Sequence, residues 1–216
     1  MWLMRRFRQG LLPPQMGAQM YHPRQLLAFD TFERPTTTSA EGIGTADSGQ
    51  EWVIRGGNIH IVRPGIARTI SSGMATLDIK GRQDQWTVHG LLISYRGTSN
   101  RHGLIVAYAD PDNLIRVATY ANQLRIEKVV DGNTTVLATK TREYDIRDND
   151  SRWDWMAVSL PNMWGESLPY IRGSVGNIEV SYRLSEDPDA DRFVGKMLPG
   201  IWGYSTSYFS RFYVVD

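Results

Sequence analysis

The sequence predicts an all-β sandwich, and three features of the chain support that prediction. Between Gln85 and Lys140, apolar and polar residues alternate in segments of strand length that are separated by turn residues. No segment keeps the apolar spacing i, i+3, i+4 and i+7 over the length of a long helix. The 216 residues, 41% of them hydrophobic and 11% aromatic, are enough for one large β domain with a substantial core.

The residues before this stretch predict an opening strand and further short strands. Leu27, Phe29 and Phe32 alternate around Asp30, and a polar loop then follows. Glycine punctuates what comes next, so we expect strands at 51–54 and 58–62 around Arg55-Gly56-Gly57, and at 68–72 and 74–80 around Gly73.

Turn residues divide the central stretch into hairpins. In Asp110-Pro111-Asp112-Asn113, proline presets φ at the second position, and aspartate and asparagine can bond to their own backbone. Ala121-Asn122 marks a second turn and Asp131-Gly132-Asn133 a third, with predicted strands at 114–120, 123–130 and 134–139 between them.

The last third of the chain continues the same pattern. Residues 153–160 predict a strand with Trp155 on one face and Met156 on the other, and the sequence leaves open which face points inward. A hairpin is predicted around Gly176-Asn177, and an acidic loop follows. Phe209 and Phe212 belong to the closing strand, 209–215, which we expect to pair with the opening strand.

The first 27 residues differ from the rest of the chain, so we divide the chain into an extended basic arm (1–27) and a sandwich domain (28–216). The arm holds four arginines and no acidic residue. It lacks the apolar run of a secretory signal and is too short to span a bilayer. Four interpretations remain: a membrane-surface helix, a nucleic-acid tail, a disordered leader, or a docking arm that orders on a partner.

A docking arm is the interpretation that we favour. Pro13-Pro14 suits an extended peptide better than a continuous helix. Apolar anchors mixed with arginine can occupy a partner's groove and pair with carboxylates at its rim. The residues expected to dock are Trp2, Arg5, Arg6, Phe7, Arg8, Leu11 and Leu12.

The residues carry no recognisable catalytic pattern. The chain has no cysteine, which excludes disulfides, thiolate metal sites and a cysteine nucleophile. Its four histidines are dispersed, and no strand carries the alternating carboxylates with which glucanases of the sandwich fold cleave a glycosidic bond. A formal charge of +1 argues against general polyanion binding. We therefore predict a protein that is not an enzyme and that binds neither nucleic acid nor membrane.

One acidic loop resembles the start of a calcium site. Asp187, Asp189 and Asp191 alternate as the first three ligands of a calcium loop do, but Arg192 and Leu198 stand where such a loop has its glycine and its closing glutamate. We predict no cofactor and name no metal ligands, while calcium binding remains an open alternative.

Two pairs of segments carry a family resemblance. The opening segments are Phe29-Asp30-Thr31-Phe32-Glu33-Arg34 and the run from Gly44 to Trp52; the closing ones are Gly200-Ile201-Trp202-Gly203-Tyr204 and the run from Phe209 to Val215. Together they resemble the concanavalin A-like (laminin-G-like) sandwich domains of tailed-bacteriophage minor tail and other structural proteins. The resemblance covers roughly residues 28 to 216, and it implies a jelly-roll β-sandwich. The chain departs from it at Tyr213, where such domains often carry asparagine or aspartate.

The resemblance also implies a function. We expect a virion structural protein, either a minor tail protein or a capsid-decoration subunit, anchored by its arm to other virion proteins in several copies or as a homo-oligomer. The alternative is a glycan-binding adhesion module that contacts the host cell surface. In that case Trp164, Trp202 and Tyr204, which the sequence places in loops or near strand ends, are the expected glycan contacts.

Overall fold

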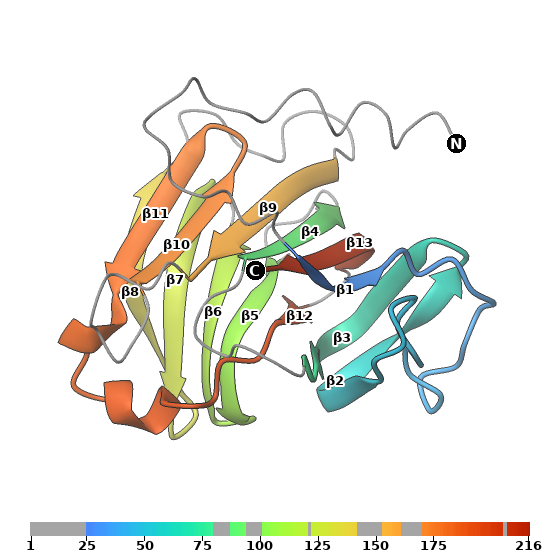
Figure 1. Cartoon of the computed structure of the whole chain (residues 1–216), viewed down its shortest axis with the longest axis horizontal. Coiled ribbons are helices and arrows are strands. Elements are labelled where there is room, and N and C mark those ends of the chain that lie inside the picture. Colours follow the sequence, from blue (N-terminus) through green and yellow to red (C-terminus); the bar gives the residue numbers. More distant parts are fainter. Residues whose placement is uncertain are drawn as a thin grey trace.

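The computed structural model describes residues 25–79, 87–93, 101–120, 122–141, 153–160, 170–204 and 207–216. These residues form a jelly-roll β-sandwich (Figure 1). The strands are β1 (Leu26–Asp30), β2 (Trp52–Arg63), β3 (Ile66–Leu77), β4 (Thr87–Ile93), β5 (Arg101–Asp110), β6 (Asn113–Tyr120), β7 (Gln123–Val130), β8 (Asn133–Thr141), β9 (Trp153–Ser159), β10 (Tyr170–Val175), β11 (Ile178–Arg183), β12 (Gly200–Tyr204) and β13 (Tyr208–Val215). Two short 3₁₀-helices, η1 (Leu184–Glu186) and η2 (Ala190–Phe193), follow β11.

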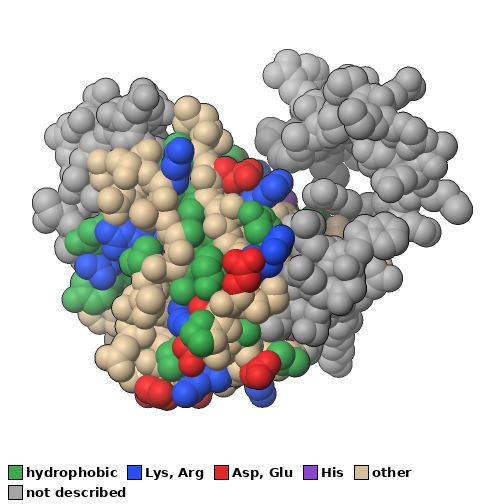
Figure 2. All heavy atoms as spheres, turned by 90° about the vertical axis from the view of Figure 1, so that its left-hand side faces the viewer, with side chains coloured by type: hydrophobic (Ala, Val, Ile, Leu, Met, Phe, Trp, Pro, Cys, Tyr) green, Lys and Arg blue, Asp and Glu red, His purple; other side chains and the backbone are tan. Residues whose placement is uncertain are grey.

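Hydrogen bonding joins the strands in the order β11-β10-β9-β4-β13-β3-β12-β5-β6-β7-β8, with β1 on β13 and β2 on β3. The sheet folds over on itself, so β10 and β11 lie in front of β7 and β8 in Figure 1 and pack against them. Seen from the left-hand side of that view, acidic and basic side chains lie interspersed over the surface (Figure 2). That side of the molecule therefore carries no field of a single sign.

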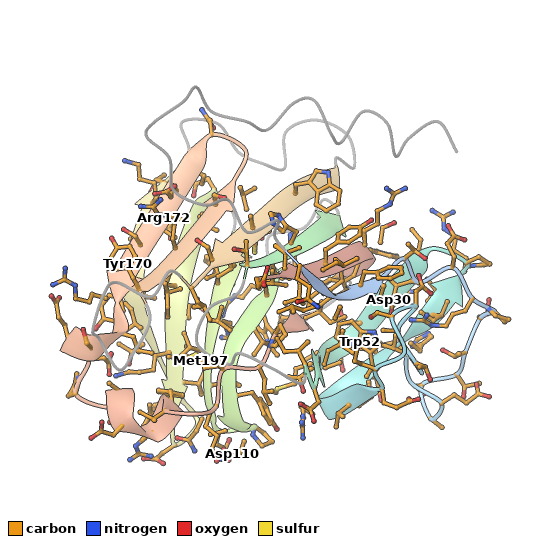
Figure 3. The ribbon with its side chains drawn as sticks, in the orientation of Figure 1. Asp30, Trp52, Asp110, Tyr170, Arg172 and Met197 are labelled. Atoms are coloured by element: carbon orange, nitrogen blue, oxygen red, sulfur yellow. The ribbon has the colours of Figure 1, made fainter. Side chains whose placement is uncertain are left out.

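The opening segment is held by a buried carboxylate. Asp30 accepts hydrogen bonds from the backbone N–H of Phe32 at 2.7 Å and from the indole Nε1 of Trp52 at 2.6 Å, and it forms an ion pair with Arg34. Figure 3 shows Asp30 and Trp52 close together beside β1 and β2. Phe32 has a positive φ of 56°, which turns the chain out of β1 and buries the ring against Trp52. Burial raises the pKa of Asp30 although its hydrogen-bond partners and Arg34 lower it.

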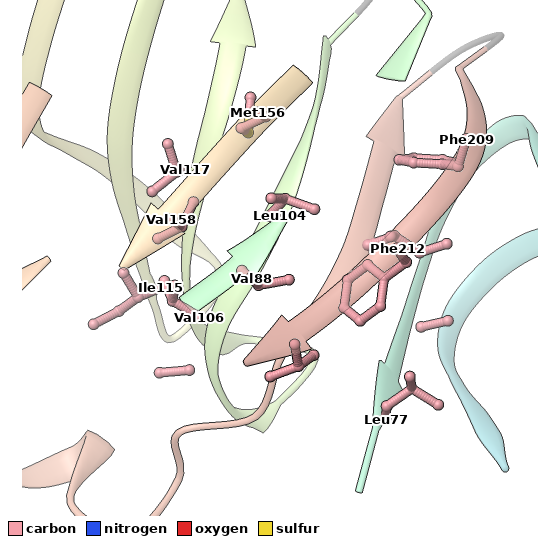
Figure 4. Close-up of a cluster of buried hydrophobic side chains, with 14 of the residues drawn as sticks. Leu77, Val88, Leu104, Val106, Ile115, Val117, Met156, Val158, Phe209 and Phe212 are labelled. Carbon is pink, nitrogen blue, oxygen red and sulfur yellow. The ribbon is translucent and has the colours of Figure 1, made fainter. Parts of the chain in front are cut away.

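The core lies between the two layers (Figure 4). Met156 and Val158 of β9 are fully buried in it, together with Leu104 and Val117 from the opposite layer. Trp155 on the other face of β9 is 42% exposed. The inner face of this strand is therefore the aliphatic one, which settles the choice that the sequence left open.

The closing strand pairs with the opening strand as predicted. In the β1–β13 pairing, Ala28 lies opposite Val214 and Asp30 opposite Phe212. The turn at Asp131-Gly132 is also confirmed, because both residues have positive φ, at 49° and 77°, as the two-residue hairpin turn of mirror-image type requires.

The glycines of β2 and β3 do not separate short strands as predicted. Both strands run through them for 12 residues, and the register shifts beside Gly56 and Gly57. A Cβ on Gly57 would lie 1.9 Å from the carbonyl oxygen of Ser72, and one on Gly73 would lie 2.4 Å from the side chain of Ile59. Glycine here permits the close approach of two strands at a bulge, which a turn-based interpretation missed.

The predicted arm lies almost wholly outside the described residues, so the division at residue 27 stays a prediction; β1 itself begins at Leu26. Within the described part of the chain, no helix is long and apolar enough to cross a membrane.

Candidate functional site

One face of the layer containing β12, β5, β6 and β7 carries aromatic and arginine side chains in register. Tyr204 pairs with Arg101, Arg101 with Tyr120, and Tyr120 with Gln123, so the four residues form a row across four adjacent strands. Partners in antiparallel strands point to the same side of the sheet. We call this surface the arginine–tyrosine face and define it as Arg101, Tyr120, Gln123, Arg125 and Tyr204, with the more buried Arg116, Glu127 and Trp202 in the neighbouring rows of the same face.

Two guanidinium groups lie against one ring in this row. The Cζ atom of Arg101 is 4.1 Å from the ring centroid of Tyr120, and that of Arg125 is 4.5 Å from it. The Nε–H of Arg125 also donates to the Oε1 atom of Gln123 at 2.8 Å. Tyr204, at the end of the row, is 50% exposed. The face thus presents an accessible ring beside several hydrogen-bond donors.

The neighbouring rows are buried and paired. The Nε–H of Arg116 donates to the Oε2 atom of Glu127 at 2.9 Å, and its Nη2 lies 2.8 Å from the same oxygen. The Cζ atom of Arg116 lies 3.7 Å from the ring centroid of Trp202. Burial lowers the pKa of Arg116, and the carboxylate of Glu127 opposes that effect. This ion pair therefore holds Arg116, Glu127 and the adjoining ring of Trp202 in place beside the exposed row.

The predicted glycan contacts fare differently. Trp202 is only 6% exposed because β12 lies between β3 and β5 and because Arg116 stacks on its ring, so the exposure that we expected is not found. Tyr204 is exposed as expected. Trp164 lies outside the described residues, as do the predicted docking residues of the arm, Trp2, Arg5, Arg6, Phe7, Arg8, Leu11 and Leu12.

Sequence reasoning missed Arg101, Tyr120, Gln123 and Arg125. A signal existed for two of them, since Tyr120 and Gln123 flank the predicted turn at Ala121-Asn122 and must therefore pair. No signal in the sequence placed β12 beside β5, and that pairing brings Tyr204 next to Arg101.

The acidic loop is already held by a cation of the protein itself. The Nζ atom of Lys128 lies 2.6 Å from Asp187 Oδ1 and 2.7 Å from Asp189 Oδ2, and the hydroxyl of Tyr182 donates to Asp187 Oδ2 at 3.1 Å. An ammonium group thus sits where the calcium alternative would place its ion. Among the described residues, no group of three or more histidines or acidic residues could hold a metal.

His102 lies on the reverse side of β5, directly after Arg101. It is buried, and burial lowers its pKa to about 4. Between about pH 6.5 and 4, this histidine is protonated in the unfolded chain but stays neutral in the folded chain. The free energy of unfolding is therefore expected to fall between about pH 6.5 and 4, by up to about 1.4 kcal/mol per pH unit from this residue.

Urea unfolding of the wild type and of His102→Gln at several pH values in this range tests the expectation. In His102→Gln, the free energy of unfolding should no longer fall with pH by the amount that His102 contributes, whatever the absolute stability of the variant. Equal slopes in the two proteins would mean that His102 titrates normally.

No protein-family model matches the sequence, and a search of curated proteins gives no match. Among solved structures, the chain is similar to the GH43 protein BlXynB of Bacillus licheniformis, with a TM-score of 0.57 and 12% identity over 94% of this chain and 40% of that one. It is similar to β-agarase A with a TM-score of 0.56 and 10% identity over 89% and 92% of the two chains. It is also similar to the carbohydrate-binding module CBM66 of Bacillus subtilis, with a TM-score of 0.52 and 10% identity over 74% and 94%.

These likenesses establish the jelly-roll fold. The concanavalin A-like architecture predicted from the sequence is confirmed. The chain spans 40% of the BlXynB chain, so it matches one part of that larger protein.

The comparisons also correct one prediction. Agarases and glucanases are enzymes, and structures of both share this fold. The prediction that the chain is not an enzyme is contradicted by these neighbours and is therefore wrong. None of the structures named here is a phage protein, so virion membership, location and partners stay predictions from the sequence.

Proposed function

We propose that this protein binds carbohydrate, and that the arginine–tyrosine face holds an oligosaccharide. The observation that carries the proposal is the row Tyr204–Arg101–Tyr120–Gln123 across four adjacent strands. Protein sites for sugars combine aromatic rings, which cover the apolar side of the sugar, with a few fixed polar groups that bind its hydroxyls. The row supplies both.

The length of the row favours a chain of sugars over a single one. Neighbouring strands lie about 4.7–4.9 Å apart, so the row from Tyr204 on β12 to Gln123 on β7 spans three such spacings, about 14–15 Å. One sugar ring does not reach across that distance. The side chains are also mounted on strands, which hold them in place more firmly than loops do.

The structural neighbours support this proposal over virion assembly. CBM66 is a carbohydrate-binding module whose chain is matched over 94% of its length, so the likeness extends to almost the whole of a module of that kind. Several other neighbours, including β-agarase A in complex with oligoagarose, are glycan-acting proteins.

The test is a glycan array on the full chain, followed by calorimetry on the oligosaccharides that bind. Tyr204→Ala is expected to weaken binding roughly tenfold, because it removes an exposed ring from the row. The matched control is Trp155→Ala, which removes a ring that is 42% exposed on the other layer, and it should leave binding unchanged.

Two results would contradict the proposal. One is the absence of binding to any glycan, and the other is a loss of binding with Trp155→Ala but not with Tyr204→Ala, which would move the site to the opposite layer. Because enzymes share the fold, the binding mixtures should also be analysed for shortened sugars.

A further inference from the structure

We propose that the oligosaccharide bound on the arginine–tyrosine face is acidic, and that Arg101 and Arg125 bind its anionic oxygens beside Tyr120. This inference rests on the proposed function and names the class of its ligand. The shared chemistry is that of a carboxylate or a sulfate ester, since guanidinium groups recognise both through paired N–H donors.

Arg101 is the first part of the argument. Its guanidinium stacks on Tyr120 with a Cζ-to-centroid distance of 4.1 Å. Among the residues that the structure describes, no carboxylate lies within ion-pair distance of Arg101, whereas Arg172, Arg183 and Arg192 each have one. Stacking occupies the flat face of a guanidinium and leaves the N–H donors at its edge available. Arg101 is therefore a positioned cation with unused donors.

Arg125 is the second part. The Nη1 atom of Arg125 lies 3.8 Å from Glu127 Oε1, too far for a hydrogen bond, while Arg116 holds Glu127 at 2.8 and 2.9 Å. Glu127 is thus chiefly the partner of Arg116. The charge of Arg125 is only partly compensated.

The charge of the face as a whole points the same way. Among the described residues of these rows, Arg101, Arg116 and Arg125 stand against one carboxylate, Glu127. The other residues paired with them are uncharged: Tyr204, Tyr120, Gln123, Trp202, Gly103, Ala118, Thr139 and Ile105. The whole chain has a formal charge of only +1, and the side of the molecule that Figure 2 presents mixes the two signs. The excess is therefore local, and an anion in the row would relieve the repulsion between the arginines.

The experiment compares matched ligands on the full chain by calorimetry. The probes are an oligogalacturonate with its neutral methyl ester, and a sulfated galactan oligosaccharide with its desulfated form. At least one acidic probe is expected to bind roughly tenfold to a hundredfold more tightly than its neutral partner, and the difference should shrink at high salt. Which acid shows the preference identifies the anionic group.

Arg101→Gln is expected to remove most of this preference, and Arg172→Gln on the other layer to leave it intact. Unfolding curves establish that both variants are folded. If neutral and acidic forms bind equally, or if Arg172→Gln lowers the preference as much as Arg101→Gln does, the acidic ligand is refuted while carbohydrate binding still stands. If no probe and no glycan on the array binds, the proposed function itself fails.

Discussion

Phe212→Ala is expected to lower the free energy of unfolding by about 3–5 kcal/mol, as the truncation of fully buried phenylalanines does. Phe212 has no exposed surface, and the centroid of its ring lies 5.0 Å from that of the Trp52 ring in an edge-on contact. Its strand is paired along both edges, which limits how far its neighbours can move into the cavity. Urea unfolding followed by tryptophan fluorescence measures the change.

Ser210→Ala is the control for this measurement, since Ser210 lies on the same strand, is only partly buried and removes little volume. Its effect should stay within roughly 0.5 kcal/mol. A loss of less than about 1 kcal/mol for Phe212→Ala would show that the core around Trp52 can repack.

Removal of residues 209–216 is a harsher form of the same test. β13 pairs with β4 along one edge and with β1 and β3 along the other. Its loss would expose unpaired strand edges in the middle of the sandwich, so we expect insoluble or unfolded protein. A soluble truncated chain with unchanged stability would contradict the pairing.

Lys128→Met is expected to cost about 3–5 kcal/mol, because it leaves the buried carboxylate of Asp187 without its cationic partner. Arg192→Met is the control, since it breaks only exposed ion pairs, with Asp131 at 3.0 Å and with Asp189 at 3.7 Å, leaves Lys128 and Asp187 paired, and should cost less than about 1 kcal/mol. Adding Asp187→Asn to Lys128→Met should recover part of the loss. If the single variant is as stable as the wild type, the loop of η1 and η2 does not depend on this lysine.

The difference in the free energy of unfolding between the wild type and Lys128→Met depends on pH through the ion pair of Lys128 with Asp189. The hydrogen bond from Lys128 lowers the pKa of Asp189 below its ordinary 3.8, so its contribution is present above that value and is lost as the pH falls through the lowered one. Burial disfavours the charged form of Lys128, but Asp187 and Asp189 outweigh burial and raise its pKa above 10.5, so its contribution is lost only as the pH rises beyond that. The difference between wild type and Lys128→Met should be constant from about pH 5 to 9 and shrink below about pH 4.

The parts of the fold that the sequence predicted are those with local causes. Asp131-Gly132 forms its hairpin because both residues tolerate positive φ. The strands β6 and β7 were predictable from their apolar residues, among them Ile115, Val117 and Ile126, which the fold buries. The bulges of β2 and β3 escaped prediction because a glycine that admits a neighbouring backbone looks, in sequence, like a glycine that turns the chain.

The candidate site was harder to predict because it depends on non-local pairing. Tyr204 could be chosen from its place near a strand end, but Trp202 in the same strand is buried by β3 and β5, which are distant in sequence. Arg101 appeared to be an ordinary surface residue until the register placed Tyr120 and Tyr204 on either side of it. Only the lateral order of the strands reveals such a row.

The position of β12 between β3 and β5 has a consequence for the order in which the protein matures. Arg101 and Tyr120 belong to one hairpin and can meet early. Tyr204 pairs with Arg101 across a sequence separation of about a hundred residues, and such non-local pairing is slow to form. A growing chain on the ribosome therefore carries an incomplete row until the segment after residue 199 has emerged and inserted. If the face binds sugar as proposed, the newly made chain reaches its full affinity only after β12 has inserted between β3 and β5.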